Sequence, residues 1–464
     1  MHSLNVNKQG LICNNINLSQ AMVLDPDNVF WAMTAKDAQG APFVSREILS
    51  LYQKQKDSLD EEMKQFRFSA ELSAVYIDPT DRCNSNCPYC YVPAKMRKNG
   101  AQMTTEQLRQ VLNKVLDYFS GKERKPVIIF HASEPLLAKE AVFSAIREFK
   151  DKFSFGLQTN GLLLEKGDVE FLKKYRVGVG ISLDAPLRSL NNKTRPSASR
   201  LAFGSPRRTP RGEPSVKGGN FDAVVRAIEW FDGYAGLNVI STMTKFNIHS
   251  LDKMVRFLHS KKVPCVLFNP VRFTQKHSLK VKPDEKLMTK NFLKAVDSAI
   301  ELSQNSGRGI IVANFSNVIL SIVAPEARRM MCDISPCGGG RCFLTVTASG
   351  EMIPCGEFIG LKNSSGGNIF KTGIKEAMQS EPFQKIRSRF VEKIAECDVC
   401  LYRNICGAPC PAELGSMGNM FQKAVFCEFY KAIIKHAFKL IAEGKEKYCF
   451  REEGWDNLEY NYQL

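Results

Sequence analysis

Three cysteines, Cys83, Cys87 and Cys90, have the side-chain type and the spacing that hold an iron–sulfur cluster. A [4Fe–4S] cluster takes four thiolates, so this compact set leaves one iron open to a ligand from outside the protein. Chemistry can take place at that open iron. Zinc is the alternative, but zinc normally takes four ligands from paired cysteine or histidine units. No histidine or fourth cysteine lies near residues 83–90.

The chain has fifteen cysteines, and most of the remaining ones lie in its last third. So many cysteines without an export signal point away from disulfides and toward metal sites. The spacing C-x2-C-x5-C-x3-C, followed by one more cysteine, is formed by Cys397, Cys400, Cys406, Cys410 and Cys427. A second pattern, C-x(9–15)-G-x4-C, is met upstream by Cys337, Gly350 and Cys355.

The segment 81–91, with Tyr89 directly before its last cysteine, resembles the radical S-adenosylmethionine (SAM) superfamily. This resemblance implies that the amino and carboxylate groups of SAM bind the open iron. It also implies that SAM is cleaved to a 5′-deoxyadenosyl radical, so that the cofactor supplies the difficult step. The three cysteines are then the catalytic ligands, and Tyr89 belongs to the cofactor site. An external electron donor such as flavodoxin or ferredoxin is expected.

Three further residues match positions that bind SAM in this superfamily. Glu134, within a segment that resembles a Gly-Gly-Glu-Pro motif, would receive the SAM ammonium group through a charge-assisted contact. Here Ala132 and Ser133 replace the two glycines. Ser182 matches a ribose contact, and Arg195 matches the residue that meets the SAM carboxylate. These assignments depend on the resemblance and on the order of the motifs along the chain.

The C-terminal cysteine pattern resembles the SPASM domain, which holds two further [4Fe–4S] clusters. By this resemblance Cys397, Cys400, Cys406 and Cys427 hold one cluster, and Cys337, Cys355 and Cys410 hold the other. The protein would then carry three [4Fe–4S] clusters and SAM.

The fourth ligand of the upstream auxiliary cluster has two candidates. Cys332 sits five residues before Cys337, as in relatives that add a cysteine there. Cys342 alternates with Leu344 and Val346, which favours a strand whose small apolar side chain faces a core. We therefore favour Cys332. The other three thiols, Cys13, Cys265 and Cys449, are expected to be structural.

The elements that must position these residues alternate between strand and helix from residue 73 onward. Apolar periodicity predicts helices near residues 104–119, 138–150, 167–175, 220–232, 248–260 and 285–304, the first opened by a capping box from Thr104 to Gln107. Strands are predicted at 74–77, 127–130, 153–158, 177–183, 237–243 and 265–268. Strict alternation indicates an α/β fold with a parallel sheet and crossover helices. The radical SAM resemblance implies a partial (β/α)6 barrel of the TIM type.

The chain is long enough for two or three domains. We expect an N-terminal cap or partial peptide-binding segment at 1–72, with strands within 23–35 and a helix at 45–66. The radical SAM barrel is expected at 73–325. A loop-rich SPASM domain, ending in a C-terminal helix, is expected at 326–464.

The composition limits the partners and the location. No signal peptide and no run of 18 apolar residues occur, so a cytoplasmic protein without membrane contact is expected. Oxygen attacks such clusters, which implies an anaerobic or microaerobic cell. The net charge of +16 is spread along the chain without a nucleic-acid-binding motif, so nucleic acid is not the expected partner. A basic stretch from Arg195 to Lys217 would suit an acidic substrate or be a solvated loop.

Most enzymes of the resembled architecture act on peptides or proteins, which predicts oxidation or cross-linking of a ribosomally made peptide or protein. An anaerobic sulfatase-maturating enzyme is the nearest alternative. There an Asp directly after the upstream auxiliary cysteine serves as a base, whereas Gly356 follows Cys355 here. Strand alternation would point the next acid, Glu357, the other way. A non-catalytic iron–sulfur electron carrier or peptide-binding protein is the alternative of another class, but it needs none of the SAM-binding residues.

Overall fold

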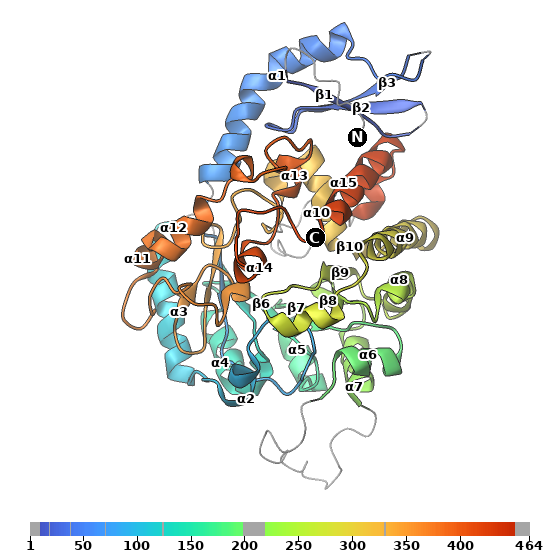
Figure 1. The fold of residues 1–464 in the computed structure, drawn as a ribbon. Coiled ribbons are helices and arrows are strands. Elements are labelled where there is room, and N and C mark those ends of the chain that lie inside the picture. The colour runs from blue at the N-terminus through green and yellow to red at the C-terminus, as the bar shows by residue number, and fades with distance from the viewer. Residues whose placement is uncertain are drawn as a thin grey trace.

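A nine-stranded sheet forms the centre of the molecule (Figure 1). The computed structural model describes residues 10–450 except 18, 38, 70, 123–124, 198–218 and 329–330. The strand order is β10-β9-β8-β7-β6-β5-β4-β11-β12, and every pair is parallel except β11 with β12. The strands are β4 (Ala74–Ile77), β5 (Val127–Phe130), β6 (Ser154–Thr159), β7 (Gly178–Ser182), β8 (Leu237–Met243), β9 (Cys265–Pro270), β10 (Ile311–Val312), β11 (Phe343–Val346) and β12 (Met352–Ile353).

The six predicted parallel strands are confirmed as β4 to β9. The first five predicted helices lie between these strands, and the sixth follows β9. The protein is an α/β protein whose parallel central strands and crossover helices form a partial barrel of the TIM type, followed by a loop-rich C-terminal part. The barrel helices are α2 (Ala94–Asn99), α3 (Thr105–Phe119), α4 (Lys139–Phe149), α5 (Lys166–Lys174), α6 (Arg188–Thr194), α7 (Gly219–Phe231), α8 (Leu251–Ser260) and α9 (Glu285–Ser306).

Helix α3 shows how the sequence encodes these helices. The Thr104 side chain accepts a hydrogen bond from the Gln107 backbone at 3.1 Å, and the Gln107 side chain accepts one from the Thr104 backbone at 2.9 Å, so the predicted capping box is confirmed. Five of its apolar residues, which share one face of the helix, are buried: Leu108, Val111, Leu112, Val115 and Phe119. The core therefore lies between the helices and the sheet.

An antiparallel sheet precedes the barrel. It consists of β1 (Ile12–Asn15), β2 (Gln20–Leu24) and β3 (Trp31–Ala35), and α1 (Arg46–Lys64) follows, capped by the Ser45 side chain. The predicted strands and helix of this region are thus confirmed. We call residues 10–69 of the described chain the N-terminal module. In Figure 1 it lies against α13 and α15 of the C-terminal part.

The C-terminal part, residues 313–450 of the described chain, is rich in loops. Its helices are α10 (Ala313–Val323), α11 (Ile374–Gln379), α12 (Glu381–Arg387), α13 (Arg403–Cys406), α14 (Pro411–Ser416) and α15 (Cys427–Ala442). Strand β11 pairs with β4, with Phe343 opposite Ala74, so residues beyond the predicted boundary at 326 extend the barrel sheet. The division of the chain at 72 and 325 stays a prediction. No helix among the described residues is long and apolar enough to cross a membrane.

Candidate iron–sulfur and cofactor site

The three cysteines lie on the loop that follows β4 at its carboxyl end, the end at which barrel enzymes hold ligands. Burial raises the pKa of Cys83 and raises that of Cys87 to about 11, and each of these thiols feels the charge of neighbouring cysteines. Asn160, after β6, approaches the Cys83 sulfur with its amide nitrogen at 3.8 Å. The structure therefore brings the three predicted ligands together.

Two guanidinium groups lie near these thiols. Arg97 donates to the Val92 carbonyl at 3.1 Å and to Asn86 Oδ1 at 3.0 Å, and its charge favours the thiolate forms of Cys87 and Cys90. Arg195 acts in the same direction on both thiols. Buried cations suit metal-bound thiolates, which are anionic, better than neutral thiols. Nowhere in the described ranges do three acidic, cysteine or histidine side chains converge on a single metal ion. Three thiols with no fourth cysteine or histidine near residues 83–90 fit a [4Fe–4S] cluster with one open iron better than zinc, which takes four ligands.

Arg195 is held by a carboxylate that the sequence analysis missed. Its Nε lies 3.1 Å from Asp184 Oδ1, and the Tyr89 hydroxyl donates to Asp184 Oδ2 at 2.5 Å. The guanidinium also lies over the Tyr89 ring, 5.5 Å from its centroid. Asp184 is fully buried two residues beyond Ser182, the half-buried end of β7. The position of Asp184 directly after a predicted strand was the signal that could have identified it.

Glu134 is fully buried and accepts three hydrogen bonds. Donors are the Leu136 backbone at 3.1 Å, the Thr159 hydroxyl at 2.7 Å and the Asn160 backbone at 2.8 Å. Burial raises its pKa, against the effect of these donors. The Glu134 side chain therefore ties the end of β5 to the end of β6, next to Cys83. Its contact with the SAM ammonium stays a prediction.

A row of three side chains joins the cysteine loop to the strand ends. His131 Nδ1 lies 3.3 Å from Asp78 Oδ1, and its Nε2 lies 3.1 Å from the Tyr91 hydroxyl. Asp78 is fully buried, and its second oxygen has no hydrogen-bond partner among the described residues. The sequence analysis missed this row, although Asp78 and His131 directly follow two predicted strands.

The upstream auxiliary cysteines also converge. Burial raises the pKa of Cys332, Cys355 and Cys410, and the nearby Cys337 raises each of the three further. Cys332 is exposed to solvent. Cys342 is 3% exposed, precedes β11 and interacts only with Cys337 of this group. Cys332 thus completes a group of four, and its role as the ligand stays a prediction.

The distal cysteines form the other group. Burial raises the pKa of Cys397 to about 11, with further contributions from Cys400 and Cys427, and Cys406 feels the same two neighbours. Arg389 lies between the two groups and is 1% exposed. It interacts with cysteines of both groups and donates to three carbonyl oxygens, those of Ala408, Met420 and Gln422. A buried guanidinium with this environment fits two sets of metal-bound thiolates.

The expected direction of Glu357 is wrong, because Gly356–Phe358 form a 3₁₀ turn and not a strand. Burial raises the pKa of Glu357 to about 7, while Arg272 and His131 lower it. The Glu357 carboxyl group is therefore close enough to Arg272 and His131 to be stabilised by their charges. Arg272 is paired there with the buried Glu413 at 3.3 Å. Most of the basic stretch, residues 198–217, lies outside the described residues.

Two family models match the chain. Residues 77–258 match the radical SAM superfamily, and residues 337–401 match SPASM, an iron–sulfur cluster-binding domain. The matched ranges contain Cys83, Cys87 and Cys90 in the first case and Cys337, Cys355 and Cys397 in the second.

Related sequences and solved structures agree with these matches. An uncharacterized protein of Archaeoglobus fulgidus is 40% identical over 422 residues, which cover 91% of this chain and 92% of that protein. A cysteine-type anaerobic sulfatase-maturating enzyme of Clostridium perfringens is 23% identical over 385 residues, covering 79% and 96%. The structure of native anSMEcpe with bound AdoMet and Cp18Cys peptide has a TM-score of 0.66 at 21% identity, covering 81% and 99%. Streptococcus suis SuiB bound to its precursor peptide SuiA has a TM-score of 0.54 at 12% identity, covering 92% and 100%. At these identities the two structures show the fold alone.

Proposed function

Because this chain belongs to the radical SAM superfamily and carries an SPASM domain, we propose that it cleaves SAM to a 5′-deoxyadenosyl radical and oxidises or cross-links a ribosomally made peptide or protein. The observation that carries the proposal is the convergence of Cys83, Cys87 and Cys90 beside the buried Arg195. A cluster bound by these thiols supplies the electron that breaks SAM. The solved structures of anSMEcpe and SuiB hold the Cp18Cys and SuiA peptides, which supports a peptide substrate here.

The residues around the cysteines would hold SAM and exclude water. Arg195 keeps a fixed orientation through Asp184 and Tyr89, so its guanidinium is positioned for the SAM carboxylate before SAM binds. Asn160 and Glu134 fix the strand ends next to Cys83. Ser182 would contact the ribose. A flavodoxin or ferredoxin in an anaerobic cytoplasm is the proposed electron donor.

The two C-terminal cysteine groups would complete a set of three [4Fe–4S] clusters. Each group offers four thiolates, which leaves no open iron. We therefore assign these clusters to electron transfer and not to SAM cleavage. After the substrate gives up a hydrogen atom, its carbon radical would lose one electron along this route and a proton to a nearby base, or couple to a second group.

Anaerobic reconstitution tests this proposal. Iron and sulfide should each reach about 12 per chain, because three clusters contain four of each. Replacing Cys83, Cys87 and Cys90 together by Ala should remove about four irons and abolish formation of 5′-deoxyadenosine. Retained SAM cleavage in this variant would refute the assignment.

A second candidate function is sulfatase maturation, which the Clostridium perfringens relative's name states for that protein. Gly356 stands here where sulfatase-maturating enzymes carry an Asp, which argues against it. A sulfatase-derived peptide converted to formylglycine as fast as the best native peptide would favour this second function.

A further inference from the structure

A cavity of about 400 Å³ opens between the barrel, the end of the N-terminal module and the C-terminal part. Its walls include Arg341, Arg387 and Lys375, together with Phe68 and Tyr118. The three cations run from a buried to an exposed position: Arg341 is 5% exposed, Arg387 is half-buried and Lys375 is exposed. The cavity is therefore lined by positive charge from its interior to its mouth.

These cations lack anionic partners in the described part of the chain. Arg341 donates to two backbone carbonyls, those of Phe66 at 3.1 Å and Pro336 at 3.3 Å. Arg387 donates to the Gly340 carbonyl at 2.8 Å and to a methionine sulfur. No ion pair with a described carboxylate involves either arginine or Lys375. Burial, with the nearby charge of Arg341, lowers the pKa of Arg387. An anion that enters the cavity would stabilise these neighbouring cations electrostatically.

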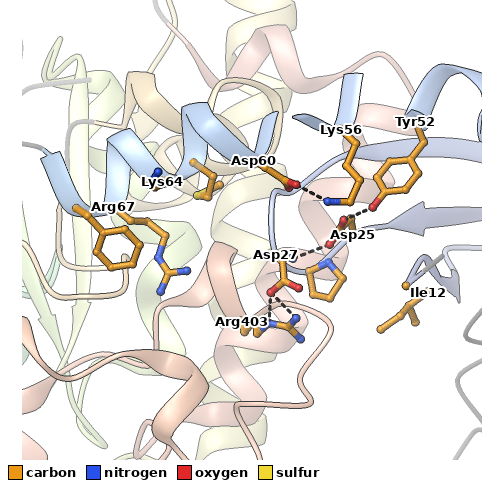
Figure 2. A pocket seen from close by; sticks show the side chains of 13 residues that line it. Ile12, Asp25, Asp27, Tyr52, Lys56, Asp60, Lys64, Arg67 and Arg403 are labelled. Atoms are coloured by element: carbon orange, nitrogen blue, oxygen red, sulfur yellow. Dashed lines mark hydrogen bonds and ion pairs between the residues drawn. The ribbon is translucent and has the colours of Figure 1, made fainter. Parts of the chain in front are cut away.

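The acidic residue that lines the same cavity is already neutralised. Glu71 pairs with Lys122 at 2.7 Å, and Arg67 is bound by both oxygens of Glu392 at 2.7 and 2.9 Å. A neighbouring cavity of about 510 Å³ shares Arg67 and Phe68 and offers a contrast. Figure 2 shows its ion pairs, Lys56 with Asp60 and Arg403 with Asp27. That neighbour has no comparable excess of charge.

The remaining walls are apolar and aromatic. Phe68 is 50% exposed and packs edge-on against Phe390, with ring centroids 5.5 Å apart. Leu72 and Tyr118 continue this surface. A small inorganic anion would satisfy the cations and leave the aromatic wall uncovered. An acidic peptide carries carboxylates and apolar side chains together, and the cavity volume suits a few such side chains.

We propose that this cavity binds an acidic, apolar segment of the peptide substrate at a distance from the reacting residue. The inference rests on the proposed function for the identity of the peptide as a substrate. Leu72 precedes β4, whereas Cys83 follows it, so the strand separates the cavity from the SAM cysteines. The site therefore anchors the peptide and does not contact the reacting atoms.

The test uses the reconstituted protein and a fluorescently labelled synthetic peptide of alternating Glu and Leu, with a Gln-for-Glu peptide as the neutral control. Anisotropy at low salt should show binding of the acidic peptide alone. Arg387→Gln should weaken it about tenfold or more, and Lys375→Ala about two- to fivefold. Arg387→Lys should recover part of the loss. Lys371→Ala is the matched control, since Lys371 is exposed nearby and does not line the cavity.

Equal binding of the neutral peptide, or unchanged affinity in Arg387→Gln and Lys375→Ala, would overturn the inference. Inorganic phosphate that displaces the peptide at concentrations near the peptide's own Kd would identify a small-anion site instead. If Arg387→Gln loses iron, the peptide affinity of Lys375→Glu is measured instead, because Lys375 is exposed and its replacement should not disturb the fold. SAM cleavage is measured in the same samples. Peptide binding without cleavage refutes the proposed function alone, and cleavage without acidic-peptide binding refutes this inference alone.

Discussion

The carboxyl group of Glu134 satisfies three donors from two neighbouring strand ends. Two of these donors are backbone N–H groups with no access to water, so a change of acceptor leaves them unsatisfied. The structure thus gives Glu134 a positioning effect on Asn160 and, through it, on Cys83. A contact with the SAM ammonium would use the remaining lone pairs of the same carboxylate.

Replacement of Glu134 by Gln should therefore affect both stability and SAM binding. We expect the free energy of unfolding to fall by about 1–3 kcal/mol, because a buried donor loses its acceptor. SAM affinity should fall by roughly 1.5–3 kcal/mol if one charge-assisted hydrogen bond is lost. Anaerobic urea unfolding and SAM titration measure the two effects. Glu140→Gln, on the exposed side of α4, is the control. Unchanged SAM affinity would exclude the ammonium contact.

The two candidate ligands near β11 give a matched pair of variants. Cys332 is exposed and interacts with Cys337, Cys355 and Cys410, whereas Cys342 is buried and directly precedes β11. Cys332→Ala should change the electron paramagnetic resonance spectrum of the upstream auxiliary cluster and lower its iron content. Cys342→Ala should leave both as they are and only loosen local packing. The reverse outcome would transfer the ligand role to Cys342.

At the scale of elements, the N-terminal module forms hydrogen bonds with the loop between Cys400 and Cys406. The Asn14 amide donates to the Tyr402 hydroxyl at 2.8 Å, and Asn404 donates to the carbonyls of Pro26 and Asp27, each at 3.0 Å. Arg403 pairs with Asp27, as Figure 2 shows. The loop that carries the distal ligands is therefore fixed from outside the C-terminal part.

Asn404→Ala should remove the two hydrogen bonds from this loop to Pro26 and Asp27. It leaves two backbone carbonyls without their donor and should cost about 1–3 kcal/mol. We expect faster proteolysis between the N-terminal module and the barrel, and faster bleaching of the distal cluster in a chelator. Asn113→Ala, on the exposed face of α3, controls for the loss of an asparagine. Equal rates in the two variants would show that the contacts do not stabilise the distal site.

The elements of the barrel could be predicted because each strand and helix carries its own local pattern. The addition of β11 to the barrel sheet could not be predicted. Phe343 and Ala74, which pair there, lie far apart in the sequence, and the free edge of β4 determines which strand pairs with it. The turn at Gly356–Phe358 was mistaken for a strand because three residues carry no period. Contacts such as Asp184 with Arg195 depend on neighbouring strand ends, which a sequence pattern locates only to within a few residues.

For the whole molecule, the distribution of charge distinguishes SAM binding, which would use buried cations, from peptide binding, which would use exposed ones. The cations at the SAM cysteines are buried: Arg97 is 6% exposed and the Arg195 side chain 12%. Other cations of the described chain are exposed, among them Lys375, which lines the cavity. Salt screens exposed charges strongly and buried pairs much less. The two binding events should therefore differ in their response to salt.

Raising the salt from about 0.1 M to about 1 M shortens the Debye length from about 10 Å to about 3 Å. We expect the affinity for an acidic peptide to fall steeply, while uncoupled SAM cleavage changes little. Arg207, Arg208 and Arg211 lie outside the described residues. Neutralising the three together should lower peptide affinity at low salt and have no effect at high salt, because salt screens charge contacts in water. Peptide binding by anisotropy and 5′-deoxyadenosine formation, measured across one salt series, check both statements. A parallel loss of SAM cleavage would mean that the surface charge also holds the SAM site together, and the separation of the two kinds of binding would be wrong.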